Sequence, residues 1–330
     1  MPGWTGTYDW RGLLPGSANP FALDPPGDLV LNANNRPVSA PASVGYNGEW
    51  DPGFRNTYLL SKLDPLRGAD VAAMSRLQND YTSLPVQRFR DVIASANPTT
   101  GLGQQAQKIV RDWDGALGVD SAGAAVYEEW LLAMIHLAFA DKLGPALYAE
   151  YLSNGAAPFA LYLLAPNAAS QWFVELGDSA VTGRDALAGA ALDEGAKDLV
   201  RRLGPDPAKW RWGDLHTISF EHPLSAAKPL DLILTVGPVR RAGDGYSPNN
   251  GAYSLDKPFT LRSHPSERQI VDLGDLDASV SITPVGQSGQ PYSRHWGDQT
   301  QLWARGETKP MPLSREHLGQ LEGKLVLRPR

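Results

Sequence analysis

The chain has 330 residues, with 30 lysines and arginines against 36 aspartates and glutamates, and it contains no cysteine. This length allows about two domains or one large domain, with a core that needs no disulfide or zinc to fold. The missing cysteine excludes thiolate catalysis, cysteine-ligated zinc and iron–sulfur clusters. A net charge of −6 without a basic block argues against nucleic acid as a partner.

The longest apolar run covers residues 130–140 and is interrupted by His136. It is far shorter than the roughly 20 residues of a membrane span, so we expect a buried helix there and no membrane partner. The first residues contain neither a basic region nor an apolar stretch, so no signal peptide is visible.

Composition divides the chain into three sections. Residues 1–66 are rich in Gly, Pro, Asn and Trp, which predicts ordered loops with one short strand at 28–31. Residues 67–204 follow helical periodicity, and residues 205–330 carry strand patterns separated by turns. Helices grouped before strands predict an α+β or mixed α/β fold rather than an alternating βαβ fold.

In the helical section, Asp70 is a predicted N-cap for a helix whose apolar spacing continues to residue 81. Pro85 should end or kink that helix. Further helices are expected at 104–115, 122–142, 145–153 and 183–203. Thr182 is the predicted cap of the last helix, and Gly204 is its predicted end.

The third section predicts short strands. They are expected at 215–220, 230–236, 260–262, 269–273 and 278–283. A short amphipathic helix is expected at 296–304.

Common catalytic motifs are absent: the chain has no Gly-x-Ser-x-Gly elbow, phosphate loop, His-Glu-x-x-His pair or dinucleotide fingerprint. His216 and His222 would share one face of a strand, which permits a two-histidine metal site. The simpler interpretation is two hydrogen-bonded histidines beside Trp210 and Trp212. His136, on its apolar helix, is interpreted as a core histidine.

Acidic residues also stand together on the predicted helices. Asp112 and Asp114 flank Trp113, and Glu128 is followed by Glu129. We expect these carboxylates to face solvent, with Trp113 buried.

The segment Asn32-Ala33-Asn34-Asn35 follows the predicted short strand. An asparagine amide can donate a hydrogen bond to a developing oxyanion. Asparagine also tolerates left-handed turns, so the same cluster fits a simple turn. The residues alone leave both interpretations open.

Ordered motifs along nearly the whole chain match one known pattern. They are 3–12, Asn19-Pro20, 26–27, 32–37, Phe54-Arg55, 77–80, 210–216, 220–224, 286–289, Asp298-Gln299 and Trp303. Together they resemble the penicillin acylase (penicillin amidase) family of N-terminal-nucleophile hydrolases. The resemblance implies that the chain forms the C-terminal part of the large chain, within a four-layer αββα sandwich.

The resemblance also implies a mechanism. A precursor is cut to expose a serine whose hydroxyl attacks an amide and whose own α-amine acts as the base. An asparagine side chain and a backbone N–H then stabilise the oxyanion. By position, Asn34 corresponds to this asparagine, and Arg55 to an arginine that orders the active site. Arg55 could also tie down a loop beside Asn56.

The chain departs from the family pattern in two places. The nucleophilic serine and most of the acyl pocket are expected in sequence preceding Met1, because Ser17, Ser39 and Ser43 do not match by position. The expected partners are therefore this upstream segment or chain and a small-molecule amide, and the isolated chain should be inactive.

Some members hold a structural calcium, but Val44 stands where a carboxylate would be expected. No cofactor is expected for the chemistry.

Three functions stay open from the resemblance. The first is penicillin acylase-like hydrolysis of a linear amide. The second is an acyl-homoserine lactone acylase, and the third is an inactive fragment or a subunit that completes a partner chain. A periplasmic or secreted location is expected from the resemblance only.

Overall fold

The computed structural model describes residues 2–25, 27–37, 50–66, 68–153, 155–174, 181–319, 321 and 323–328. The chain divides into two compact units, Met1–Leu66 and Arg67–Arg330. Three residues singled out by the sequence, Ser39, Ser43 and Val44, lie outside the described residues.

The first unit has little regular structure. It contains the 3-10 turns Gly3–Thr5 and Gly16–Ala18 and one helix, α1 (Phe54–Leu63). The sequence did not predict α1, which is anchored by the buried side chains of Phe54 and Tyr58, four residues apart. The predicted strand at 28–31 is wrong, because this stretch has no paired strand and Val30 is exposed.

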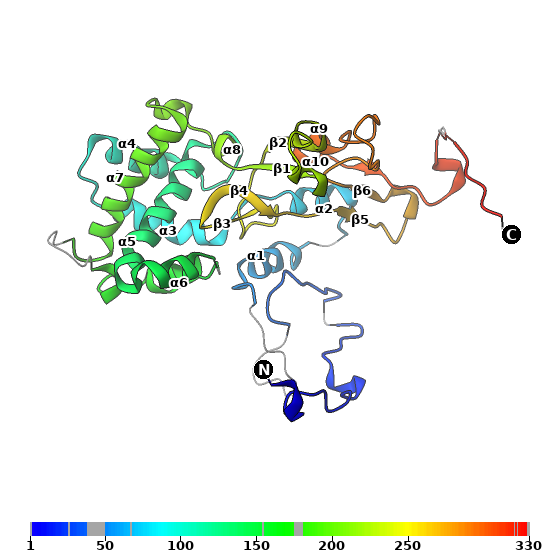
Figure 1. Cartoon of the computed structure of the whole chain (residues 1–330), viewed down its shortest axis with the longest axis horizontal. Helices are drawn as coiled ribbons and strands as arrows, with labels where there is room; N and C mark the ends of the chain where they lie inside the picture. Colours follow the sequence, from blue (N-terminus) through cyan, green and yellow to red (C-terminus); the bar gives the residue numbers. More distant parts are fainter. Residues whose placement is uncertain are drawn as a thin grey trace. The chain divides into compact units, whose positions relative to one another are not determined.

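The second unit gathers most of its helices on one side, while the strands and the remaining short helices lie together on the other (Figure 1). The helices are α2 (Val71–Gln78), α3 (Leu84–Ser95), α4 (Gly101–Asp112), α5 (Ala122–Ser153), α6 (Ala157–Leu164), α7 (Arg184–Leu203), α8 (Trp212–Leu215), α9 (Asp231–Leu234) and α10 (Thr300–Ala304). Five short 3-10 turns lie among them in the described part: Gln171–Phe173, Pro207–Lys209, Pro223–Ala226, Leu276–Ala278 and Arg315–His317.

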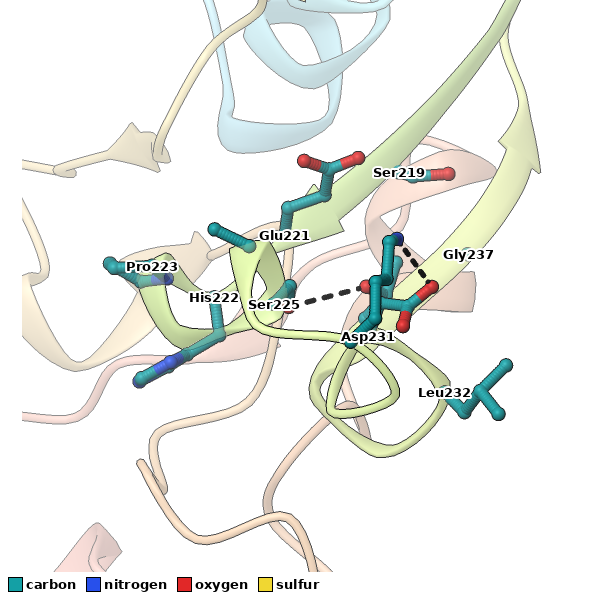
Figure 2. Close-up of a pocket in the computed structure, with 11 residues that line it drawn as sticks. Ser219, Glu221, His222, Pro223, Ser225, Asp231, Leu232 and Gly237 are labelled. Atoms are coloured by element: carbon teal, nitrogen blue, oxygen red, sulfur yellow. Dashed lines mark hydrogen bonds and ion pairs between the residues drawn. The ribbon is translucent and has the colours of Figure 1, made fainter.

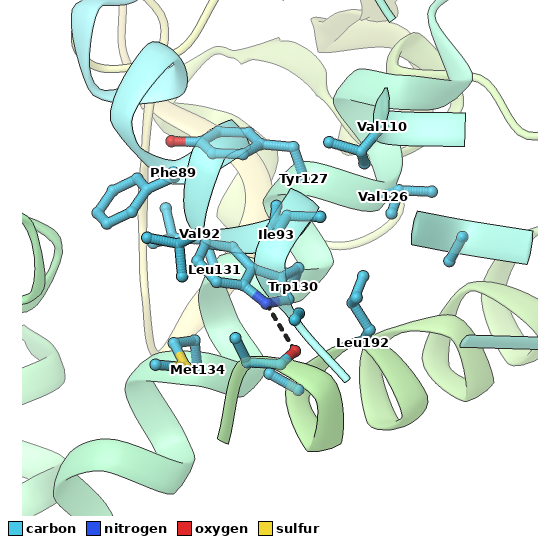
Figure 3. Packing of buried hydrophobic residues seen from close by; sticks show 14 of the residues in the cluster. Phe89, Val92, Ile93, Val110, Val126, Tyr127, Trp130, Leu131, Met134 and Leu192 are labelled. Atoms are coloured by element: carbon cyan, nitrogen blue, oxygen red, sulfur yellow. Dashed lines mark hydrogen bonds between the residues drawn. The ribbon is translucent and has the colours of Figure 1, made fainter. Parts of the chain in front are cut away.

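The main core lies where α3, α4 and α7 pack around α5 (Figure 3). Phe89 and Ile93 from α3 meet Tyr127 and Trp130 from α5, and Leu192 closes the core from α7. The rings of Phe89 and Trp130 have centroids 5.6 Å apart. Aromatic contact of this kind adds to the free energy gained by burying the two rings.

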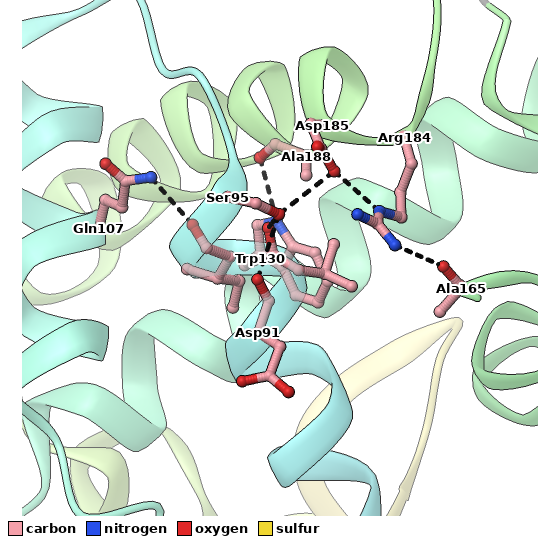
Figure 4. Close-up of polar contacts among 10 residues, drawn as sticks. Asp91, Ser95, Gln107, Trp130, Ala165, Arg184, Asp185 and Ala188 are labelled. Atoms are coloured by element: carbon pink, nitrogen blue, oxygen red, sulfur yellow. Dashed lines mark hydrogen bonds and ion pairs between the residues drawn. The ribbon is translucent and has the colours of Figure 1, made fainter. Parts of the chain in front are cut away.

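Hydrogen bonds from side chains to backbone join the same helices (Figure 4). The indole N–H of Trp130 donates to the carbonyl oxygen of Ala188 at 3.1 Å. Gln107 donates to the carbonyl oxygens of Ile93 and Ala96 at the end of α3, at 2.9 and 2.7 Å. The Gln107 bonds supply donors at the C-terminal end of α3, where backbone carbonyls lack partners in a next helical turn.

The helix predictions hold where local signals decide the structure. Asp70 caps α2 by accepting a hydrogen bond from the N–H of Ala73 at 2.7 Å, as predicted. Gly144, with φ of 69° and ψ of 164°, breaks α5 into the two predicted helices. Gly204 ends α7 with φ of 92°. The sequence missed α6.

Two details of the helix predictions are wrong. Pro85 neither ends nor kinks the first helix, because α2 stops at Gln78 and Pro85 lies in the first turn of α3. Proline is well accepted there, since the first turn does not use its N–H. Thr182 is not the cap of α7: Gly183 holds that position, without a side-chain bond.

In the described residues, α5 is the one helix whose length and composition would suit a membrane span. One third of the residues in its most apolar stretch are buried inside the protein. The buried helix expected at 130–140 is confirmed, because Trp130, Met134 and Ile135 face the core. The prediction for His136 is wrong: its side chain is exposed and its ring packs edge-on against Tyr148, 5.6 Å away.

The strands form two small sheets. The first has the order β2-β1-β4-β3 and consists of β1 (Thr217–Glu221), β2 (Thr235–Arg240), β3 (Ala252–Ser254) and β4 (Lys257–Ser263). The second has the order β5-β6-β7 and consists of β5 (Arg268–Ile270), β6 (Val280–Ile282) and β7 (Lys309–Pro310). All described pairs are antiparallel except β1 with β4.

The strands differ from the prediction in several bounds: β4 is longer than the expected 260–262, β5 ends before the expected 273, and β6 is shorter than the expected 278–283. The sequence did not predict β3 and β7. Three further differences concern helices. The run 230–236 begins as the helical turn α9, and only then becomes β2, because short apolar runs fit a helical turn as well as a strand. Residue 215 belongs to the helical turn α8 rather than to β1. The helix expected at 296–304 is shorter than predicted, because α10 begins only at Thr300 and residues 296–299 form bends and turns.

The predictions for the two acidic pairs, Asp112 with Asp114 and Glu128 with Glu129, have opposite outcomes. Asp112 and Asp114 are exposed around the buried Trp113, as predicted. The prediction for Glu128 and Glu129 is wrong, since each is only 2% exposed. The first turns of α5 are enclosed on all sides, since residues 123–131 are all buried.

Each buried glutamate has a partner. Glu128 accepts a hydrogen bond from the hydroxyl of Tyr253 at 2.7 Å, and Glu129 pairs with Arg202 at 2.7 Å. Burial raises the pKa of Glu128 to about 8. Burial also raises the pKa of Glu129 to about 7, against the attraction of Arg202.

Two buried arginines contact α10: Arg241 follows β2 of the first sheet, and Arg268 begins β5 of the second sheet. Arg241 and Arg268 both donate to Oδ1 of Asn249, at 2.6 and 2.8 Å, and both donate to the carbonyl oxygen of Trp303. Both guanidinium groups also lie over the Trp303 ring, 4.0 and 4.9 Å from its centroid. Burial lowers the pKa of Arg241 to about 9 and that of Arg268 to about 10.

Candidate active site

The segment 32–35 forms a tight turn in the first unit. Oδ1 of Asn32 accepts a hydrogen bond from the N–H of Asn34 at 2.9 Å, and Oδ1 of Asn35 accepts one from the N–H of Ala33 at 3.1 Å. Asn34 has a φ of 62°, in the left-handed region that asparagine tolerates better than most residues. The turn interpretation therefore holds for the backbone, while the side chain of Asn34 points to another partner.

That partner is Arg55, in the first turn of α1. Its Nη2 donates to Oδ1 of Asn34 at 2.8 Å. An arginine can only donate hydrogen bonds, so it fixes which end of the amide faces it. The Nδ2 group of Asn34 is thereby held on the opposite side of the amide, oriented as a donor. The structure brings together the two candidate residues that lie 21 positions apart in the sequence.

Asp51 completes this arrangement, and the sequence reasoning missed it. Its carboxylate pairs with the same Nη2 of Arg55, and its N–H donates to the carbonyl oxygen of Asn34 at 3.1 Å. A weak signal was available, because Asp51 and Arg55 have opposite charges and lie only four residues apart, although Asp51 precedes α1.

A separate polar pocket of about 620 Å³ lies in the second unit, between β1, α9 and β2 (Figure 2). Its volume suits a small molecule. Lys228 is paired with Asp231 at 2.7 Å, and the hydroxyl of Thr235 contacts that of Ser225 at 3.4 Å. The described groups therefore form no nucleophile–base pair in this pocket.

His216 has a structural environment. It is fully buried and stacks on Trp212, with ring centroids 4.4 Å apart. Its Nδ1 and Nε2 lie 3.0 and 3.1 Å from the carbonyl oxygens of Arg241 and Gly251. Burial lowers the pKa of His216 to about 4. The simpler interpretation, a hydrogen-bonded histidine beside a tryptophan, is correct for this residue.

His222 lies in a different place. Its Nδ1 accepts a hydrogen bond from the N–H of Leu224 at 3.1 Å, and its ring faces Trp296 rather than Trp210 or Trp212. The even spacing fails because both histidines lie just beyond the ends of β1, and the pairing of β1 also shifts between Ile218 and Phe220. Among the described residues, no group of three or more His, Asp or Glu side chains is arranged to hold a metal ion. The calcium prediction at Val44 stays untested.

A family model described as penicillin amidase matches residues 1–320. The chain belongs to the penicillin amidase family. Members of this family are acylases that hydrolyse amide bonds. The resemblance inferred from the sequence motifs is confirmed.

Two curated relatives that are named for different activities are similar to this chain. Acyl-homoserine lactone acylase QuiP of Pseudomonas putida is 25% identical over 342 residues, 98% of this chain and 42% of that protein. Penicillin acylase 2 proenzyme of Pseudomonas sp. strain SE83 is 29% identical, over 94% of this chain and 40% of that protein. The chain therefore spans about two fifths of the length of these curated relatives.

The fold also has a solved counterpart. The thermostable penicillin G acylase from Alcaligenes faecalis matches 98% of this chain and 61% of its own, with a TM-score of 0.56 and 18% identity. The predicted mixed α+β chain with a penicillin acylase-type N-terminal-nucleophile hydrolase fold is confirmed. The prediction that all 330 residues form one penicillin acylase-like domain stays a prediction.

Proposed function

We propose that this chain is part of an amidase that transfers an acyl group to an N-terminal serine and then to water. The observation that carries the proposal is the amide of Asn34, oriented by Arg55. The family membership supplies the reaction class, amide hydrolysis. The nucleophilic serine is assigned to sequence outside these 330 residues, because the matched relatives are more than twice as long.

In this mechanism the serine hydroxyl adds to the substrate carbonyl, and its proton passes to the serine's own α-amine. A free α-amine has a pKa near 8, which suits a base at neutral pH. The C–N bond then breaks, the amine leaves with the proton, and water hydrolyses the acyl ester. The carbonyl oxygen carries negative charge in both tetrahedral intermediates.

Asn34 would stabilise that charge through Nδ2. A donor that is already oriented costs little reorganisation when the charge develops, which makes such groups effective in catalysis. Arg55 would act by holding Oδ1 and would add positive charge near the site. Its side chain is only 16% exposed, so it has few alternative positions.

The exposed apolar side chains of the first unit support the proposal that another segment of the enzyme covers this unit. In the first unit, large side chains stand in solvent, among them Trp4, Trp10, Leu13, Phe21 and Leu23. Exposed apolar groups in such number typically mark a surface that another segment covers. We assign that covering segment to the part of the enzyme that carries the nucleophile.

An acyl-homoserine lactone acylase is the second candidate. Relatives named for this activity match 98% of the chain. It would use the same Asn34 and Arg55 but accept long aliphatic acyl groups. Initial rates of the complete enzyme on phenylacetyl and dodecanoyl amides separate the two, since the preferred acyl chain reports the pocket directly.

The proposal is tested on the protein purified from its native source, by intact mass and N-terminal sequencing. A companion chain that begins with serine, together with amide hydrolysis, supports it. A single chain without amidase activity supports instead an inactive fragment or a subunit that completes a partner. The isolated 330 residues should show no turnover. Export to the periplasm or medium is part of the same proposal.

A further inference from the structure

The position of Arg55 is unfavourable for α1 by itself. A helix N-terminus carries partial positive charge, so a cation in the first turn is repelled. Arg55 is the second residue of α1, which begins at Phe54 after Gly53. Some other interaction must hold the guanidinium group there, and the contacts of Asp51 identify it.

Asp51 contacts both candidate residues at the same time. Its carboxylate takes one hydrogen of the Arg55 Nη2 group, and the other hydrogen of that group goes to Oδ1 of Asn34. Its backbone N–H donates to the carbonyl oxygen of Asn34 at 3.1 Å, next to the bridge between Asn35 and Asp51. One residue thus holds both the backbone and, through Arg55, the side chain of Asn34.

We infer that Asp51 is a positioning residue for the oxyanion donor. It acts at two points: the backbone contact holds Asn34 in its left-handed conformation, and the carboxylate holds the arginine that orients the amide. This inference rests on the proposed function, because it gives Asp51 no role unless Asn34 donates to the oxyanion.

The carboxylate and the backbone contact can be separated by mutation. Asp51→Asn keeps the N–H and the size of the side chain but removes the charge that attracts Arg55. In the complete, processed enzyme we expect kcat to fall by about tenfold or more, the scale typical of residues that orient a functional group. KM should change little, because the amide of Asn34 acts on the transition state.

A double-mutant cycle provides the readout that a merely structural role would not produce. If Asp51 acts through Asn34, then Asp51→Asn should have almost no further effect on kcat in the Asn34→Ala background. Asp64→Asn is the matched control, since Asp64 is an exposed acid just after the other end of α1. It should leave kcat unchanged in both backgrounds.

The outcomes distinguish the two claims. A kcat that is unchanged in Asn34→Ala overturns the proposed function. A large loss in Asn34→Ala, with no loss in Asp51→Asn or with fully multiplicative losses in the double variant, overturns the inference alone. If Asp51→Asn does not give processed enzyme, the cycle is run with Asp51→Glu, which keeps the charge but displaces it. A loss of kcat in Asp51→Glu that persists in the Asn34→Ala background again overturns the inference.

Discussion

Tryptophan shows how differently the two units of the chain are built. In the first unit, Trp4 and Trp10 are 89% and 98% exposed, whereas Trp130 and Trp212 in the second unit are at most 1% exposed. The second unit therefore has its own core. The first unit holds the candidate catalytic residues but not enough internal packing to bury its apolar side chains. The candidate site and the main core thus lie in different units.

The largest expected effect tests the core of the second unit. Trp130→Ala should reduce the free energy of unfolding by about 3–5 kcal/mol, as for other large aromatic deletions in cores. It removes the contact with Phe89 and the hydrogen bond to Ala188. Urea unfolding of the 330-residue chain measures the loss. The matched variant Trp10→Ala should change stability by less than about 0.5 kcal/mol. Equal effects of the two variants would contradict the contrast between the units.

The second prediction concerns catalysis in the first unit. In the complete enzyme, Asn34→Ala should remove about 3 kcal/mol of transition-state stabilisation, the usual cost of losing one oxyanion donor. This loss corresponds to a decrease in kcat/KM of about 100-fold. Stability should fall by only about 1 kcal/mol, because Asn34 lies on the surface and the main cost is alanine at its left-handed φ. Steady-state kinetics measure the effect. A variant within a few-fold of the wild type would exclude Asn34 as the donor.

The third prediction uses the buried glutamate of the second unit. Burial raises the pKa of Glu128 to about 8 in the folded chain, from 4.5 for the free side chain. Between these values the unfolded chain ionises first, so this group makes stability fall as the pH rises from about 4.5 to 8. Glu128→Gln should remove this loss and stabilise the chain by about 1–3 kcal/mol at pH 8.

Denaturant unfolding at pH 5 and at pH 8 provides the measurement. The gain from Glu128→Gln should be small at pH 5 and larger at pH 8. Glu194→Gln, at an exposed position of α7, serves as the control and should have no such trend. A gain that did not grow with pH would mean that Glu128 is ionised in the folded protein.

The smallest expected effect concerns a helix cap. Asp70→Ala should destabilise the second unit by about 1 kcal/mol, because the N–H of Ala73 loses its acceptor. Asp70→Ser should recover most of the loss, since serine also caps helices. Stability measured by denaturant unfolding for the three proteins gives the comparison, and an unaffected Asp70→Ala would show that α2 depends on packing alone.

The sequence by itself determined features that depend on neighbouring residues or on a pattern spread along the chain. Asp70 as a cap, the break at Gly144 and the family motifs were all readable, because backbone conformation at caps and glycines is decided within a few residues. Asn34 and Arg55 were singled out by the same family pattern. Their contact was not, because α1 was not predicted.

Only the tertiary structure decided which groups meet. Glu128 is buried because Tyr253, 125 positions away, closes over it, and no local pattern reports such a partner. The turn at α9 and the shift in β1 likewise depend on how strands pair, so they were mispredicted. Asp51 joins Asn34 to Arg55 through one backbone and one side-chain contact. Most of these contacts join residues that are far apart in the sequence, so they form only when the chain has folded and a local pattern does not predict them.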